Sequence, residues 1–120
     1  PLSGKRVLIV GGTSGIGLSA AIQAKNAGAL VTVVGREPEI AKRVYEEHGF
    51  EAWRAADVTS AADIEAALAE VTRVDHLVIL AGTFVAGKVM EADLSYLRRA
   101  FDERIWSAIQ IIRTLGDRLS

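Results

Sequence analysis

Residues 5–17 read KRVLIVGGTSGIG, an apolar run that passes directly into a turn rich in glycine. Lys5–Val10 is almost continuously apolar, which is typical of a strand buried on both faces of a parallel sheet. Gly11–Gly17 forms the turn, and small and apolar residues at helical spacing follow over 16–27. Gly28 then marks the end of that helix. The stretch therefore predicts a strand, a tight turn and a helix in succession.

The same alternation continues along the chain. The patterns predict strands over 30–34, 50–55 and 77–81, and helices over 38–48, 60–71 and from about 93 to about 115. Ser60 and Asp63 resemble a capping box at the start of the third helix. Strands separated by helices of this length require a parallel sheet with helices on both faces. We therefore expect an α/β fold, a Rossmann-type doubly wound parallel sheet in three layers, with its first four strand–helix units in the spatial order 3-2-1-4.

The fourth strand is expected at an edge of that sheet, although residues 77–81 are apolar. Natural edge strands usually carry charge, proline or a bulge. We therefore expect further strands to pair with it. Residues 1–120 are accordingly interpreted as one incomplete NAD(P)-binding domain, the first part of a larger one.

Composition excludes several classes of protein. The 120 residues carry a formal net charge of −1 and contain no cysteine, which excludes a disulfide scaffold, a thiolate zinc site and a thiol nucleophile. The balanced charge predicts no nucleic-acid or membrane partner. His48 and His76 stand alone, so no metal site is expected. No secretory pattern is recognised, and a cytoplasmic location is the expectation.

The glycine turn has the context of a dinucleotide-binding turn. Gly11 allows a tight turn, and Gly15 and Gly17 let the backbone approach a diphosphate, which would rest on free N–H groups at the start of the helix. Thr13 and Ser14 add hydroxyl donors. The spacing is neither G-x-G-x-x-G nor that of a P-loop. The alternative is a strand–helix turn that binds nothing.

The tip of the second strand predicts the choice of cofactor. Gly35, Arg36 and Glu37 fall about 20 residues beyond the glycine turn, where the ribose is recognised. No acidic residue stands at the tip to repel a 2′-phosphate, and the guanidinium of Arg36 suits one. NADP(H) is therefore preferred over NAD(H), with Thr13 as a second donor. The alternative is a solvated Arg36 paired with Glu37 or Glu39.

These residues resemble the N-terminal, cofactor-binding half of the short-chain dehydrogenase/reductase family over essentially the whole chain. The family turn is T-G-x-x-x-G-x-G, and Val10 replaces its Thr. The family motif N-N-A-G corresponds to residues 79–82, where Ile79 and Leu80 replace both amides. The chain is thus interpreted as a divergent member of the family.

The resemblance implies a set of cofactor-binding residues. In the family, an aspartate after the third strand accepts a hydrogen bond from the adenine amine, and Ala-Gly lets the ribose approach the backbone. Asp57 could instead cap the next helix, as could Thr59. The cofactor-binding residues expected are Gly11, Thr13, Ser14, Gly15, Ile16, Gly17, Arg36, Glu37, Asp57, Val58, Ala81 and Gly82.

The resemblance also bears on catalysis. The family uses a Ser, a Tyr with a Lys four residues later, and an Asn on the long helix that bends it and anchors a proton relay. Neither Tyr45 nor Tyr96 has a Lys four positions on, and the family places that motif beyond residue 120. Arg104 takes the position of the Asn, and a guanidinium cannot accept a hydrogen bond. Either the relay is rebuilt around Arg104 or proton transfer is impaired; a plain helix-surface charge is the alternative.

The last predicted helix has a broad apolar surface. Family members dimerise through this helix, so a homo-oligomer formed through residues 94–115 is expected; the alternative is burial on the sheet. Ile109 and Ile111 widen the stripe. Its other members, spaced by three and four, are Leu94, Leu97, Phe101, Ile105, Ala108, Ile112 and Leu115.

The function expected is an NADP(H)-dependent oxidoreductase that transfers hydride between nicotinamide and a small alcohol or carbonyl substrate. A protein that senses NADP(H) without turnover is the alternative, favoured by Arg104 and by Ile79 and Leu80. A Rossmann-type methyltransferase is disfavoured, because Gly35 and Arg36 stand where its ribose-binding acid should be.

Overall fold

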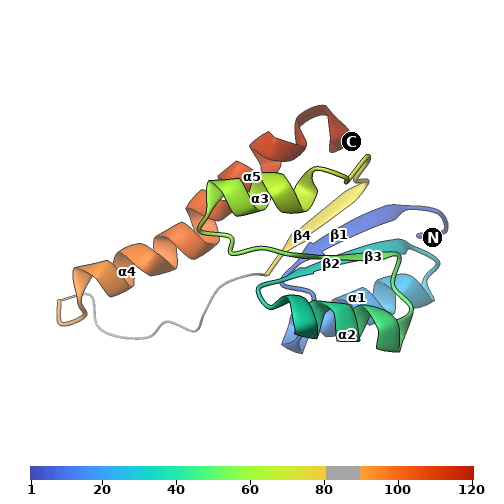
Figure 1. Cartoon of the computed structure of the whole chain (residues 1–120), viewed down its shortest axis with the longest axis horizontal. Coiled ribbons are helices and arrows are strands. Elements are labelled where there is room, and N and C mark those ends of the chain that lie inside the picture. The colour runs from blue at the N-terminus through green and yellow to red at the C-terminus, as the bar shows by residue number, and fades with distance from the viewer. Residues whose placement is uncertain (81–89) are drawn as a thin grey trace.

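The computed structural model describes residues 1–80 and 90–120 (Figure 1). Ala81 and Gly82 therefore lie outside the described residues. The strands are β1 (Arg6–Val10), β2 (Leu30–Gly35), β3 (Ala52–Ala55) and β4 (His76–Ile79). The helices are α1 (Gly15–Asn26), α2 (Pro38–His48), α3 (Ala61–Leu68), α4 (Leu94–Phe101), a π-helical turn (Asp102–Trp106), α5 (Ser107–Leu115) and a 3₁₀ turn (Gly116–Arg118).

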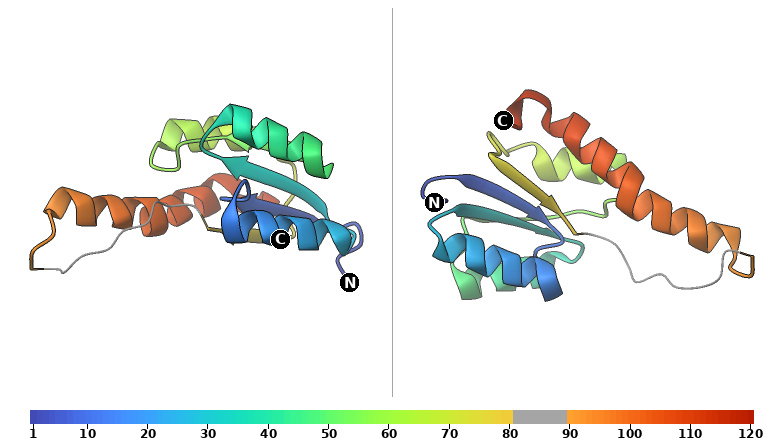
Figure 2. Two further views of the ribbon diagram at one scale, coloured as in Figure 1. Left: turned by 90° about the horizontal axis from the view of Figure 1, so that it is seen from below. Right: turned by 180° about the vertical axis from the view of Figure 1, so that it is seen from behind.

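The four strands form one parallel sheet in the order β3-β2-β1-β4, which confirms the predicted topology. β3 starts at Ala52 rather than at residue 50, and α3 ends at Leu68 rather than near residue 71. Helices α1 and α2 cover one face of the sheet, and α3 and α5 cover the other (Figures 1 and 2). The three-layer α/β fold is thus as predicted.

Side chains alternate along β1 and divide the interior into two apolar layers. Val7 and Ile9 face α1 and α2, and Leu8 and Val10 face α3 and α5; all four are 5% exposed or less. A strand with both faces covered reads as a continuous apolar run, which is why residues 7–10 show no alternation in sequence. The two layers hold the carboxyl ends of the strands in place.

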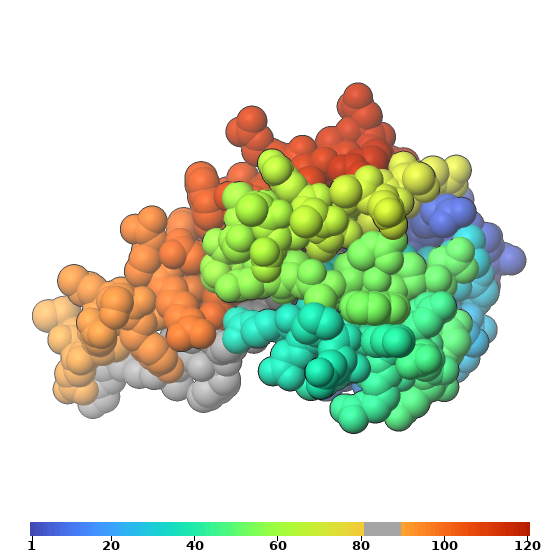
Figure 3. Space-filling model, viewed as in Figure 1, coloured from blue at the N-terminus to red at the C-terminus, as the bar shows by residue number. Residues whose placement is uncertain are grey.

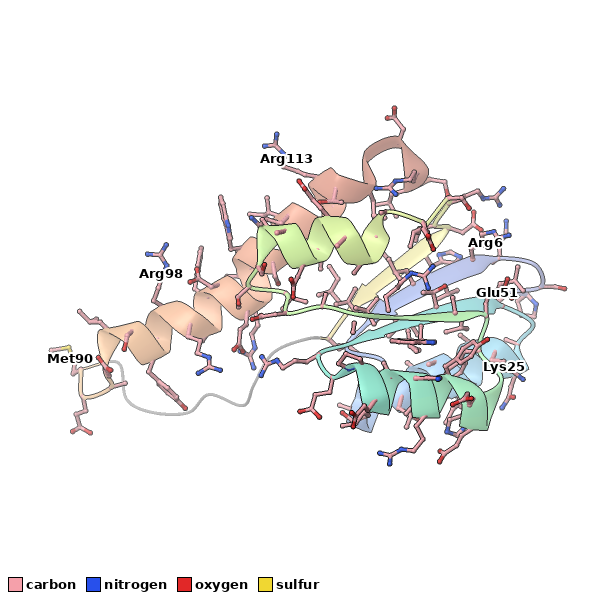
Figure 4. The ribbon with its side chains drawn as sticks, in the orientation of Figure 1. Arg6, Lys25, Glu51, Met90, Arg98 and Arg113 are labelled. Carbon is pink, nitrogen blue, oxygen red and sulfur yellow. The ribbon has the colours of Figure 1, made fainter. Side chains whose placement is uncertain are left out.

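The predicted long helix is present, but it is not regular. Asp93 caps α4 by accepting a hydrogen bond from the amide of Ser95, and the helix then continues through the π-helical turn into α5. α5 packs beside α3, whereas α4 extends beyond the carboxyl ends of the strands and buries no residue (Figures 1 and 3). Figure 4 places Met90 at the far tip of this projection.

The buried face of this helix differs from the predicted stripe. The residues buried are Glu103, Ser107, Ile111 and Leu115, which recur every four positions. Of the predicted apolar surface only Ile111 and Leu115 are among them, and Phe101, Ile105 and Ile112 are about half exposed. A π-helical turn holds one more residue than an α-turn and so rotates the faces before and after it. The sheet therefore does not account for the apolar stripe.

Within the described residues, no helix has both the length and the apolar character needed to cross a membrane.

Candidate functional site

The glycine turn brings α1 against the end of β1. Gly11 has a φ of 92°, a left-handed conformation that favours glycine, and its amide donates to the carbonyl of Val34 at 2.8 Å. A Cβ at position 17 would lie 1.9 Å from the carbonyl oxygen of Gly11. Only glycine fits at position 17, because any side chain there would collide with the backbone of Gly11.

The amino end of α1 keeps its backbone donors available. Ser14 occupies the N-cap position in an extended conformation, and its side chain makes no capping hydrogen bond. The first turn contains no acidic residue. The first N–H groups of a helix have no partner inside the helix, and they carry the positive end of its dipole. This end of α1 is therefore suited to an anion.

A cavity of about 460 Å³ opens above this turn at the carboxyl ends of β1, β2 and β3. The strand order reverses between β2 and β4 on either side of β1, and such crevices are where doubly wound sheets bind ligands. The lining residues are Val10, Gly11, Thr13, Ser14, Ile16, Gly17, Val34, Gly35, Arg36, Ala56, Val58 and Leu80.

Most predicted cofactor-binding residues of the described part line this cavity, and three do not. Gly15 is exposed at the start of α1, and Glu37 is the exposed N-cap residue of α2. Asp57 lies in an adjoining cavity that also includes Arg36. Five lining residues are absent from the cofactor-binding residues expected from sequence, and they lie at or directly after the carboxyl ends of the strands: Val10, Val34, Gly35, Ala56 and Leu80.

Gly35 at the tip of β2 lies directly against Thr13. A Cβ at position 35 would come within 2.7 Å of the Thr13 hydroxyl oxygen and methyl carbon. The Thr13 side chain thus fills the space that an acidic side chain at position 35 would need. The packing of Thr13 therefore disfavours an acidic residue at position 35, where the sequence has none.

The alternative interpretation expected Arg36 to pair with Glu37 or Glu39, and Arg36 forms an ion pair with neither of them. Its Nη2 instead lies 3.8 Å from Oε1 of Glu103, on the π-helical turn of the long helix. Half of the Arg36 side chain is exposed, whereas that of Glu103 is fully buried. The pair joins the tip of β2 to the long helix at the edge of the cavity.

Asp57 forms a local turn rather than a helix cap. Its Oδ1 accepts hydrogen bonds from the amide and hydroxyl of Thr59, at 3.0 and 2.6 Å. These bonds hold the pKa of Asp57 below its ordinary value, and the guanidinium groups of Arg36 and Arg99 act in the same direction. Ser60 caps α3 by accepting from the amide of Asp63, so capping by Asp57 or Thr59 is excluded. No described residue donates to the other oxygen of Asp57, Oδ2.

Arg104 lies on the π-helical turn and is exposed. It is not among the residues that line either cavity. The π-helical turn interrupts the helix at the position where the resemblance implied an Asn that bends it, so the irregularity is present although the Asn is not. Turns of this kind are frequent at functional sites.

Among residues 1–80 and 90–120, no group of three or more His, Asp or Glu residues could hold a metal ion.

Comparison with known proteins identifies relatives of the chain. A profile described as short chain dehydrogenase matches residues 5–119. The short-chain dehydrogenase/reductase prx4 of Penicillium rubens is 38% identical over 103 residues, covering 86% of this chain and 28% of the relative. The uncharacterized oxidoreductase YxnA of Bacillus subtilis is 32% identical over 111 residues, which cover 86% of this chain and 31% of that protein. The chain thus spans about a third of the length of these relatives.

Solved structures share the fold. An actinorhodin polyketide ketoreductase variant solved with NADPH is 28% identical, with a TM-score of 0.86 over 96% of this chain and 47% of that one. The L-sorbose reductase of Gluconobacter frateurii, solved with NADPH and L-sorbose, is 29% identical, with a TM-score of 0.78 over 94% and 46% of the two chains. With its glycine turn, its strand order and the match over residues 5–119, the chain belongs to the short-chain dehydrogenase family.

Proposed function

We propose that this chain forms the cofactor-binding part of an oxidoreductase that transfers hydride between NADP(H) and a small alcohol or carbonyl substrate. The observation that carries the proposal is one cavity lined both by the uncapped amino end of α1 and by Arg36. The two structural relatives described above were solved with NADPH, which supports the same cofactor.

The residues present fit a dinucleotide. Gly17 has no side chain to cover the turn, and no side chain caps the first N–H groups of α1, so a diphosphate could rest on them. Val58 and the free Oδ2 of Asp57 are assigned to the adenine. When bound, the nicotinamide supplies the hydride chemistry, and the protein contributes binding and orientation.

Arg36 is assigned to the 2′-phosphate. Gly35 places no charge at the tip of β2, and Thr13 occupies the space beside it. A guanidinium offers a planar fork to a phosphate, and it gains much less from a neutral 2′-hydroxyl. The cofactor is therefore NADP(H) rather than NAD(H).

Substitution of Arg36 tests this assignment. Arg36→Ala is expected to weaken NADPH binding by roughly 1–3 kcal/mol, the worth of a charge-assisted hydrogen bond, and to leave NADH binding almost unchanged. Isothermal titration calorimetry measures both. Arg43→Ala, which removes an exposed arginine of α2 outside both cavities, is the matched control. Equal losses for the two cofactors would contradict the assignment.

A sensor that binds NADP(H) without turnover is the second candidate. It is favoured by Arg104 in the position of the family's Asn and by Leu80, an aliphatic residue in an amide position, which lines the cavity. A Ser and a Tyr-x-x-x-Lys motif elsewhere in the full-length protein would support the enzyme. NADPH binding by a full-length protein without those residues would support the sensor.

We also propose that the protein forms a homo-oligomer through the long helix. Its half-exposed apolar residues are not accounted for by packing on the sheet, and exposed apolar patches mark interaction sites. These residues are Phe101, Ile105, Trp106, Ile109 and Ile112. The cytoplasmic location and the absence of a nucleic-acid partner stay predictions of the sequence.

A further inference from the structure

The carboxylate of Glu103 is buried on the packed face of the long helix. Its side chain has no exposed area, and the residues that follow it on this face are Ser107, Ile111 and Leu115. Removing a carboxylate from water costs several kcal/mol unless charged partners compensate. The partners of Glu103 therefore show what this charge does.

Two arginines from different elements contact the same oxygen of Glu103. Arg99, one turn earlier on α4, places its Nε 3.0 Å from Oε1, and Arg36 at the tip of β2 places its Nη2 3.8 Å away. Two guanidinium groups repel each other, and a carboxylate between them offsets that repulsion. Glu103 thus holds Arg99 of the long helix beside Arg36, the residue assigned to the 2′-phosphate.

Both arginines keep hydrogen-bond donors for a ligand. Arg99 binds Glu103 through Nε alone, so its two terminal nitrogens have no acceptor among the described residues. The contact of Arg36 exceeds hydrogen-bond distance, so its fork donates to none of the described residues either. About half of each side chain is exposed, at 50% for Arg36 and 60% for Arg99.

The two arginines line one cavity next to the glycine turn. It measures about 460 Å³, and Arg36 belongs both to it and to the cavity above the turn. Arg98 also lines it, but Arg98 is occupied by an ion pair with Asp102 at 3.2 Å. Asp57 is the other acid, and it binds Thr59 through Oδ1. The triad of Arg36, Glu103 and Arg99 has one net positive charge, and the carboxylate of Asp57, whose pKa both arginines lower, lines the same cavity.

We propose that Arg99 is a second binding residue for the 2′-phosphate of NADP(H), and that Glu103 is the residue that positions Arg99 and Arg36 for it; this rests on the proposed function. Two guanidinium forks match a phosphate monoester, which is a dianion with three acceptor oxygens. A neutral 2′-hydroxyl cannot engage both forks. Because Glu103 is fully buried, it holds the arginines without presenting an oxygen to the ligand.

The test compares two nucleotides that differ only in the 2′-phosphate. Affinities for 2′,5′-ADP and 5′-ADP are measured by calorimetry on the wild-type chain and on Arg99→Ala. We expect Arg99→Ala to weaken 2′,5′-ADP about tenfold, the worth of one charge-assisted hydrogen bond, and to leave 5′-ADP within about twofold. Arg99→Lys should recover part of the loss because it keeps the charge. Arg113→Ala on α5, which projects away from the molecule in Figure 4, is the control.

The positioning role of Glu103 is tested by combining its substitution with that of Arg99. In a Glu103→Gln background, Arg99→Ala should cost less than in the wild type, because the arginine is no longer held in place. If Glu103→Gln does not fold, the Arg99 variants still decide the binding role. An unchanged preference for 2′,5′-ADP in Arg99→Ala overturns this inference and leaves the proposed function standing. Failure of the wild-type chain to bind either nucleotide overturns both.

Discussion

At the scale of single residues, Gly17 is a position of the glycine turn where no side chain can be accommodated. A Cβ at this position would lie within 1.9 Å of the Gly11 carbonyl, a distance that no rotamer change can relieve because both partners are backbone. Gly15 differs from it: its φ is 56°, but a Cβ there would meet no atom within 4 Å. A substitution at Gly17 therefore tests a steric clash, whereas a substitution at Gly15 tests only the backbone preference for glycine.

Gly17→Ala should lower the free energy of unfolding by about 3 kcal/mol, the upper range for overpacking, and should abolish NADPH binding because α1 is displaced. Gly15→Ala should cost only about 1 kcal/mol, the penalty of a left-handed alanine. Urea unfolding followed by circular dichroism measures both, and calorimetry measures binding. Equal stability losses for the two variants would contradict the steric role of Gly17.

Local backbone requirements predicted the glycine turn, and position along the chain together with side-chain charge predicted the role of Arg36. The sequence could not predict the pairing of Arg36 with Glu103. That contact depends on where the long helix lies over the sheet, which no local pattern records. The only signal was a charged residue at position 103 on what becomes the packed face of the helix.

At the scale of elements, the long helix shows how one irregular turn changes an interpretation. Leu115 and Phe101, on either side of the π-helical turn, both fit an α-helical apolar stripe, yet Leu115 is 1% exposed and Phe101 is 45% exposed. The π-helical turn over Asp102–Trp106 shifts the phase of the faces, and periodicity counted through it assigns the wrong one. The bounds of the helix were predictable from its caps, whereas its buried face was not.

The ends of two helices depend on one side chain, Arg118. Its guanidinium donates to the carbonyls of Leu68 and Val71 at 2.7 and 2.8 Å, near the end of α3, and to that of Thr114 at 2.6 Å in α5. Carbonyls in the last turn of a helix have no partner within it. Arg118 thus joins α3 and α5 over the sheet.

Arg118→Ala should therefore lower the free energy of unfolding by about 2 kcal/mol, because it removes a charged donor from each of these partly buried carbonyls. Arg113→Ala, which removes an arginine of α5 with no such bonds, should change stability by less than about 0.5 kcal/mol. Chemical denaturation of the two variants measures the difference. Indistinguishable midpoints would show that Arg118 does not hold the helices together.

At the scale of the whole molecule, the sequence predicted the strand order. Helices between successive strands require parallel pairing, and the glycine turn fixes β1 as the central strand of a doubly wound sheet. The projection of α4 beyond the sheet was not predictable, because a helix without a buried face leaves no signature of its direction. The apolar surface of the long helix points instead to contacts with another subunit.

The oligomer proposal predicts a change of mass. Ile112→Glu places a charge on the half-exposed apolar surface of α5 and should convert an oligomer to a monomer, because burying an unpaired carboxylate at an interface is unfavourable. Met90→Glu removes a more exposed apolar side chain, at 93%, from the tip before α4 and should leave the assembly intact. Analytical ultracentrifugation measures both. A monomeric wild type would contradict the proposal.

A crystal structure of the chain grown with NADPH tests the assignment of the cofactor site most directly. The diphosphate should lie against the amino end of α1, between Gly11 and Gly17, with the 2′-phosphate at Arg36 and Arg99. A diphosphate bound elsewhere, or a turn that stays closed to the nucleotide while NADPH is bound at another surface, would contradict it.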